Sequence, residues 1–134
     1  MTLTPGQDAY LREHQLAVLA TGRRDGSPQL STIMYDYDGN DVAISVTSDS
    51  AKWVNALRQP RVALLVNDGL QQLILYGAAE GVSAGPERLE LTKRIRRRAM
   101  GREPSEDDAT LAAQLDETKR VILRVTPDKV LMYE

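Results

Sequence analysis

The stretch VTSDSAKWVNALRQPRVALLV (residues 46–66) decides the fold, because it joins a strand, a helix and a second strand with almost no loop between them. It opens as a strand and then predicts a helix over residues 50–58. The helix ends before Pro60, since a residue that precedes proline disfavours helical geometry. Residues 61–67 (RVALLVN) form the next strand, so a short helix lies between two apolar strands.

Polar side chains collect where the first of these strands meets the helix. Thr47, Ser48 and Ser50 supply hydroxyl groups, and Lys52 lies in the first helical turn. Two interpretations are open at this point. The residues cap the helix, whose N-terminal N–H groups need acceptors, or they hold a phosphate or carboxylate, which the helix dipole attracts. Asp49 opposes the second interpretation unless its carboxylate turns away from the ligand.

Outward from this stretch, turn and cap signals divide the chain into short elements. Asp25-Gly26 is a strong hairpin signal, and Gly77 and Gly81 indicate a bend or bulge in a long strand. We predict helices at 5–14, 50–58, 86–101 and from Pro104-Ser105 to 117. We predict strands at 15–22, 28–38, 42–48, 61–67, 70–84, 119–125 and 129–134, the last two separated by a turn at Pro127-Asp128.

This order of elements predicts the fold class. Strands joined by tight turns pair antiparallel, and about six of them with glycine bends favour closure into a barrel. No internal repeat, low-complexity tract or linker interrupts the sequence. We therefore expect one α+β domain over residues 1–134, a six-stranded antiparallel β-barrel with peripheral helices.

Composition excludes several classes of protein. The 134 residues carry a formal net charge of -2, which argues against nucleic acid as a partner. The chain has no cysteine, which excludes thiol catalysis and thiolate metal sites, and its one histidine, His14, excludes multi-histidine metal sites. The N-terminus lacks the apolar segment of a signal peptide, and no apolar run reaches membrane length. We expect a soluble, cytoplasmic protein with no metal site and no membrane partner.

Three segments together carry a resemblance to a known family. LAVLATGRRDGSPQLSTIMYDYDG (16–39), SDSAKWVNALRQPRVALLV (48–66) and YGAAEG (76–81) resemble the pyridoxamine-phosphate-oxidase-like, FMN-binding split-barrel superfamily. Within it, the chain looks like the flavin/deazaflavin oxidoreductases, whose actinobacterial members use coenzyme F420. The resemblance runs from about residue 5 to the end of the chain, with the elements in the same order.

The resemblance implies a dimeric split β-barrel with two cofactor sites at the subunit interface. The cofactor would be F420 or, alternatively, flavin mononucleotide (FMN). The residues that it places along the ring system are Gln29, Ser31 and Thr32, and those at the phosphate end are Thr47, Ser48 and Lys52, with Ser50 where some relatives have an arginine.

KRIRRR (93–98) places five cations on one predicted helix, with Arg94, Arg97 and Arg98 on nearly one side. A solvated helix face often has this composition. Alternatively, the face gathers the carboxylates of the polyglutamate tail that F420 carries and FMN lacks. The patch is short and has no interleaved aromatic residues, so it is a poor match for nucleic acid.

No residue in the sequence has the pattern of a catalytic nucleophile or an acid–base pair. In flavin and deazaflavin enzymes the cofactor carries the chemistry, while the protein supplies binding, orientation and water exclusion. The resemblance therefore implies a homodimeric F420-dependent oxidoreductase that transfers a hydride to an unsaturated small molecule such as a quinone, an enone or a tetrapyrrole. The alternatives are an FMN-dependent oxidoreductase on the same fold and a non-catalytic carrier of F420 or a tetrapyrrole.

Overall fold

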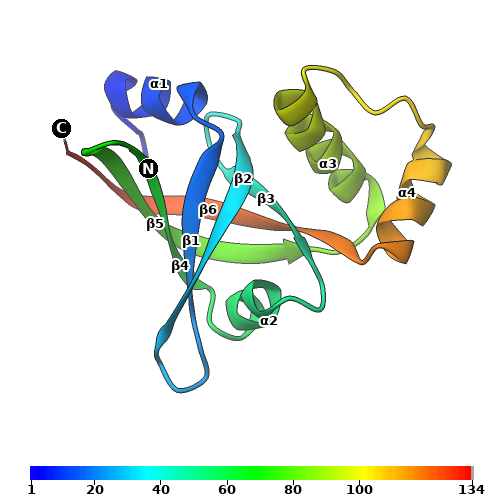
Figure 1. The fold of residues 1–134 in the computed structure, drawn as a ribbon, viewed down its shortest axis with the longest axis horizontal. Helices are drawn as coiled ribbons and strands as arrows, with labels where there is room; N and C mark the ends of the chain where they lie inside the picture. Colours follow the sequence, from blue (N-terminus) through cyan, green and yellow to red (C-terminus); the bar gives the residue numbers. More distant parts are fainter. Residues whose placement is uncertain (134) are drawn as a thin grey trace.

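Six antiparallel strands close into a barrel in which the neighbours follow the order β1-β2-β3-β6-β5-β4 (Figure 1). The computed structural model describes residues 1–133. The strands are β1 Leu16–Gly22, β2 Pro28–Tyr37, β3 Val42–Thr47, β4 Arg61–Asp68, β5 Gln71–Val82 and β6 Arg120–Tyr133. Pairing of β1 with β4 closes the sheet. The predicted α+β class, a six-stranded antiparallel barrel with peripheral helices, is confirmed.

Four helices surround the barrel: α1 Pro5–Glu13, α2 Ala51–Arg58, α3 Gly85–Met100 and α4 Asp108–Glu117. Helices α1 and α2 lie at opposite ends of the barrel, whereas α3 and α4 lie beside it (Figure 1). The prediction that α4 begins at Pro104-Ser105 is wrong. The Asp107 carboxylate accepts the Thr110 N–H at 2.8 Å and caps the helix. The helix therefore begins at Asp108, three residues after Ser105. None of the helices within residues 1–133 is long and apolar enough to cross a membrane.

The C-terminal part of the chain forms one strand, and the predicted turn at Pro127-Asp128 is wrong. Tyr76 pairs with Lys129, but Gly77 already pairs with Pro127, so Asp128 is an extra residue in β6. Such a β-bulge bends a strand without ending it. The register shift falls between Tyr76 and Gly77 of the partner strand, and Gly77 is one of the two glycines at which the sequence indicated a bend or bulge. At the other, Gly81, the pairing with Leu123 is regular. Glu134, the end of the predicted strand 129–134, lies outside the described residues.

The barrel interior is filled by alternate residues of the strands. Ile44, Leu73, Leu75 and Leu123 are fully buried, as the period of two in these segments requires. A smaller cluster lies under α3, where Leu91 and Ile95 pack on Ala43, Val82 and Ile122. This second cluster fixes α3 against the outside of β3, β5 and β6.

The barrel is split between β2 and β3. Within residues 1–133, β2 pairs with β3 only from Tyr35 to Tyr37, while the first part of β2 continues along β1. The Tyr35 N–H donates to the Gln15 carbonyl at 3.0 Å, on the β1 side. Because main-chain groups alternate sides along a strand, those of Thr32 point into the split.

Candidate cofactor-binding groove

A groove of about 610 Å³ lies at this split, and we refer to it as the split groove. Strand β2 supplies Thr32, Ile33 and Met34, and the C-terminal half of α3 supplies the opposite wall through Ile95, Arg96, Ala99 and Met100. The remaining lining residues are Ser45, Lys52 and Arg120, together with residues 102–106 of the α3–α4 connection. The volume falls in the range of small-molecule and cofactor pockets.

Four cations line the split groove: Lys52, Arg96, Arg102 and Arg120. Within residues 1–133 none of the four takes part in an ion pair, although most other arginines and lysines of the chain do. Two glutamates, Glu103 and Glu106, also line the groove, and Glu103 pairs with Arg97. The groove therefore has an excess of positive charge that the protein itself does not neutralise.

Ser50 is the N-cap of α2, so the capping interpretation holds for this residue. Its backbone is extended, its hydroxyl accepts the Trp53 N–H at 3.4 Å, and it donates to the Thr47 carbonyl at 2.7 Å. Both hydrogen-bonding functions of the hydroxyl are thus used inside the chain. Lys52, in the first turn of the helix, lines the split groove.

The other residues predicted for the phosphate end lie beside the groove and are not among its lining residues. Thr47 ends β3 opposite Arg120, and the Ser48 N–H donates to the Lys119 carbonyl at 2.9 Å. Asp49 turns toward Lys119, with 3.7 Å between carboxylate and ammonium. The Thr47 hydroxyl, with help from Lys119, lowers the pKa of the Asp49 carboxyl. The Asp49 carboxylate therefore pairs with Lys119.

The residues predicted along the ring system divide between the two faces of β2. Thr32 lines the split groove. Gln29 and Ser31 lie on the opposite face, where the Gln29 amide bonds the hydroxyls of Thr21 and Ser31, each at 3.1 Å. The strand thus brings Thr32 together with Lys52 in one cavity and leaves Gln29 and Ser31 in a separate polar network.

The three arginines that the sequence placed on one helical side are engaged within the chain. Arg94 contacts Asp36 at 2.7 Å, and Arg97 pairs with Glu103. Arg98 donates to main-chain carbonyls at the end of α1, including that of Arg12 at 2.7 Å. The cation of this helix that lines the split groove is Arg96, which the sequence reasoning did not single out.

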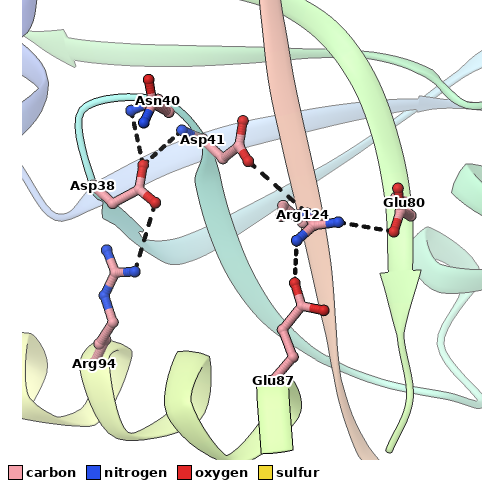
Figure 2. Close-up of polar contacts among 7 residues, drawn as sticks. All are labelled: Asp38, Asn40, Asp41, Glu80, Glu87, Arg94 and Arg124. Carbon is pink, nitrogen blue, oxygen red and sulfur yellow. Dashed lines mark hydrogen bonds and ion pairs between the residues drawn. The ribbon is translucent and has the colours of Figure 1, made fainter.

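Charged contacts hold α3 in place against the barrel (Figure 2). Arg124 of β6 donates to Glu80 of β5 at 2.8 Å and to Glu87 in the first turn of α3. Arg94 lies 3.6 Å from Asp38 in the β2–β3 turn. These contacts, together with the buried Leu91 and Ile95 of α3, fix one wall of the split groove.

Asp38 organises the β2–β3 turn that meets α3. Its carboxylate accepts the N–H groups of Asn40 at 2.8 Å and Asp41 at 2.7 Å (Figure 2). Partial burial alone would raise the pKa of Asp38, but these N–H groups and Arg94 outweigh it, and the pKa is lowered. Asp38 is therefore held in its ionised form.

Sequence reasoning missed Ser45, Arg102 and Arg120 as lining residues of the groove. Strand alternation puts Ser45 on the same face as Thr47, which was a usable signal. Arg102 and Arg120 precede and follow α4, and no local pattern brings their side chains to the split between β2 and β3. These two side chains reach the split only because of the path of the whole chain in three dimensions.

The closed six-stranded barrel and the groove at its split define the chain as a split-barrel protein. A family model described as pyridoxamine 5'-phosphate oxidase matches residues 3–134, and the chain belongs to that family. Members of this family bind flavins or related cofactors.

Solved structures agree with this assignment. An F420 reductase is similar with a TM-score of 0.74 and 25% identity, over 96% of this chain and 98% of that one. A conserved hypothetical protein from Mycobacterium tuberculosis (Rv2991) has a TM-score of 0.81 and 24% identity, over 100% of this chain and 86% of that one. HutZ, the heme storage protein from Vibrio cholerae, has a TM-score of 0.72 and 14% identity, over 98% and 94% of the two chains. The last two show the fold alone.

Proposed function

We propose that the chain is an F420-dependent oxidoreductase that transfers a hydride between the deazaflavin and an unsaturated small-molecule acceptor. The observation that carries the proposal is the presence of four cations in the split groove, none with an ion pair inside residues 1–133. A ligand with several anionic groups would neutralise them. The F420 reductase among the similar structures adds support.

The chemistry of the groove fits F420 better than FMN. One phosphate would engage Lys52 and the positive end of α2. Arg96, Arg102 and Arg120 would then be left for further anionic groups, and arginine suits carboxylates because its planar fork can bind both oxygens. A polyglutamate tail supplies such carboxylates, whereas FMN has none.

The two walls of the groove would hold the ring system. Met34, Ile95, Ala99 and Met100 offer apolar surface, and the main-chain groups of Thr32 in the split offer hydrogen bonds. When bound, the deazaflavin would supply the redox chemistry. The side chains of this protein bind, orient and exclude water, and proximity of cofactor and acceptor accounts for much of the acceleration.

A second copy of the chain would complete the site. The outer face of β1, β2, β4 and β5 is apolar, with Leu16 56%, Leu30 64% and Met34 39% exposed. Its other members include Val18, Ala20, Ala63, Leu65, Ile74 and Tyr76. Met34 belongs to this face and to the split groove, so a partner that covers the face also covers the groove.

Fluorescence titration of the apo-protein with F420 and, separately, with FMN tests the proposal. Preferred binding of F420, followed by oxidation of bound reduced F420 by a quinone, enone or tetrapyrrole, is the expected result. Preference for FMN would mean that the protein is an FMN-dependent oxidoreductase on the same fold. Binding of F420 without turnover by any acceptor would make the protein a carrier. Binding of neither cofactor would overturn the proposal.

A further inference from the structure

The connection between α3 and α4 separates two cavities. Residues 102–106 of this connection line the split groove. Glu103 also lines a second cavity of about 500 Å³, which we call the α3–α4 cavity and whose charged lining residues include Lys93, Arg97 and Asp108. Arg97 lines the α3–α4 cavity and is not among the lining residues of the split groove. The Glu103 side chain therefore has a cavity on either side.

The Glu103 carboxylate turns to the α3–α4 cavity, where it accepts a hydrogen bond from the Arg97 guanidinium. The main chain supports this arrangement. Gly101 has a left-handed φ of 74°, which ends α3 and reverses the chain, and its N–H donates to the Arg97 carbonyl at 2.7 Å. Arg97 thus holds the start of the connection through its carbonyl and Glu103 through its side chain.

The two cavities differ in how their cations are neutralised. In the α3–α4 cavity each cation of the lining has a carboxylate partner, and the pairs are Lys93 with Asp108, Arg94 with Asp36 and Arg97 with Glu103. The four cations of the split groove have no ion pair within residues 1–133. Arg97 therefore competes with four unpaired cations for the carboxylate of Glu103.

The pair of Arg97 and Glu103 can be exchanged easily. The two side chains are 51% and 56% exposed, and ion pairs that are this open to water are weak. If the pair were lost, the Glu103 carboxylate could turn about its own side-chain bonds into the split groove, where it would neutralise a cation that an anionic ligand needs. Glu106 would then no longer be the single unpaired carboxylate of the groove within residues 1–133.

We propose that Arg97 is a positioning residue that holds the Glu103 carboxylate on the side of the α3–α4 cavity and so keeps the cations of the split groove free for an anionic ligand. Arg97 acts on the ligand only through Glu103. The identity of the ligand as F420 rests on the proposed function, whereas the direction in which Glu103 turns does not.

Arg97→Gln tests the proposal because it removes the partner that draws Glu103 away. The affinity for F420 should fall roughly two- to fivefold, the effect of one partly exposed cation that is lost to the ligand. Lys93→Gln removes the same charge from the same helix, but its partner Asp108 lies outside the split groove, so the affinity should stay close to wild type. Equal losses in the two variants would overturn the inference.

Removal of the carboxylate tests the same point in the opposite direction. Glu103→Gln should restore F420 affinity in the Arg97→Gln background and should have a clearly smaller effect in wild type, where Arg97 already pairs with Glu103. Glu106 is the matched control, since it lines the groove without an ion pair within residues 1–133. Glu106→Gln should tighten binding roughly two- to fivefold in both backgrounds. An effect of Glu103→Gln that is equal in both backgrounds would contradict the role of Arg97.

A measurement without cofactor separates this inference from the proposed function. In ¹H–¹⁵N NMR spectra of the apo-protein, Glu103→Gln should shift the side-chain Nε–H signal of Arg97 and leave those of Arg96 and Arg120 in place. In the Arg97→Gln background, the same substitution should shift a groove arginine instead. Groove signals that respond to Glu103→Gln in otherwise wild-type protein would overturn the inference even if Arg97→Gln failed to fold. If F420 does not bind at all, the proposed function fails, and these signals still decide where Glu103 turns.

Discussion

The guanidinium of Arg94 lies 2.7 Å from the carboxylate of Asp36, whose side chain is only 13% exposed. The contact ties α3 to β2 and removes Arg94 from any role as a free cation. Arg96, two residues further along the same helix, has no such partner within residues 1–133 and lines the split groove. The cations of one basic helix therefore divide between holding the fold and facing the groove.

The first prediction separates these two roles. Arg96→Gln should weaken F420 binding roughly two- to fivefold, the effect expected for one partly exposed ion pair, and the loss should shrink as salt is raised. Lys93→Gln removes one charge from the same helix, but Lys93 pairs with Asp108 at 2.5 Å outside the split groove. Isothermal titration should find the affinity of Lys93→Gln close to wild type. Equal losses in both variants would mean that only the overall charge of the helix matters.

The second prediction concerns the lysine at the start of α2. Lys52→Ala should weaken binding of F420 and of FMN at least several-fold, because both cofactors carry a phosphate. Lys129→Ala, which removes an exposed lysine of β6 outside the groove, is the control. Unchanged affinity in a folded Lys52→Ala variant would show that Lys52 does not bind the phosphate.

A third prediction tests the close approach of β5 and β6 at Gly77. A Cβ at Gly77 would collide with the main-chain carbonyl of Thr126 and lie 2.9 Å from Val125 Cγ1. Gly77→Ala should therefore lower the free energy of unfolding by about 3 kcal/mol. Gly6→Ala places the same methyl group in open space on α1 and should stabilise the protein by roughly 0.5–1 kcal/mol. Urea unfolding of the three proteins gives both values, and similar stabilities of wild type and Gly77→Ala would contradict the clash.

Local signals in the sequence were sufficient for most elements of the fold. The Thr4 cap with Pro5, the Asp25-Gly26 hairpin and the irregularity at Gly77 are each encoded within a few residues, and each is present in the structure. The turn predicted at Pro127-Asp128 is wrong because local signals are not sufficient there. A turn and a bulge share the same local chemistry, and only the pairing of β6 with β5 distinguishes them.

The groove was less predictable because its electrostatics depend on contacts between distant elements. Arg94 is neutralised by Asp36 of β2, and Arg98 bonds the end of α1, more than eighty positions earlier in the chain. A charge run in a sequence does not reveal which of its members have such partners. Lys52 was singled out because it lies in the first helical turn after a run of hydroxyl residues, and Thr32 because the family pattern places it by position. Arg102 and Arg120 belong to no such pattern.

The fourth prediction concerns pH. The folded-state pKa of Asp38 is lowered, since the N–H groups of Asn40 and Asp41 and the charge of Arg94 outweigh the effect of burial. A lowered pKa means that ionised Asp38 stabilises the fold above its unfolded pKa of about 4, and that this contribution is lost as the pH falls through the folded pKa. Asp38→Ala should cost about 1 kcal/mol at about pH 7 and clearly less at about pH 3.

Unfolding of wild type and variant at both pH values measures this difference. Glu13→Ala changes an exposed carboxylate of α1 that has no hydrogen bond within residues 1–133, and its effect should be small at either pH. An Asp38→Ala penalty that does not decrease in acid would show that the turn does not depend on the charge of Asp38.

The last prediction tests the role of the apolar sheet face in dimer formation. Leu30 is 64% exposed on that face, next to Thr32 and Met34 of the groove. If a second copy covers the face, Leu30→Glu buries a charge without a partner and should raise the dimer dissociation constant at least about tenfold. Leu70→Glu is the matched control, because Leu70 is 92% exposed in the β4–β5 turn. Light scattering during gel filtration should find Leu30→Glu monomeric and Leu70→Glu dimeric. If the Leu30→Glu variant is still a dimer, the interface lies elsewhere. The groove would then have to bind F420 without a partner subunit that covers it.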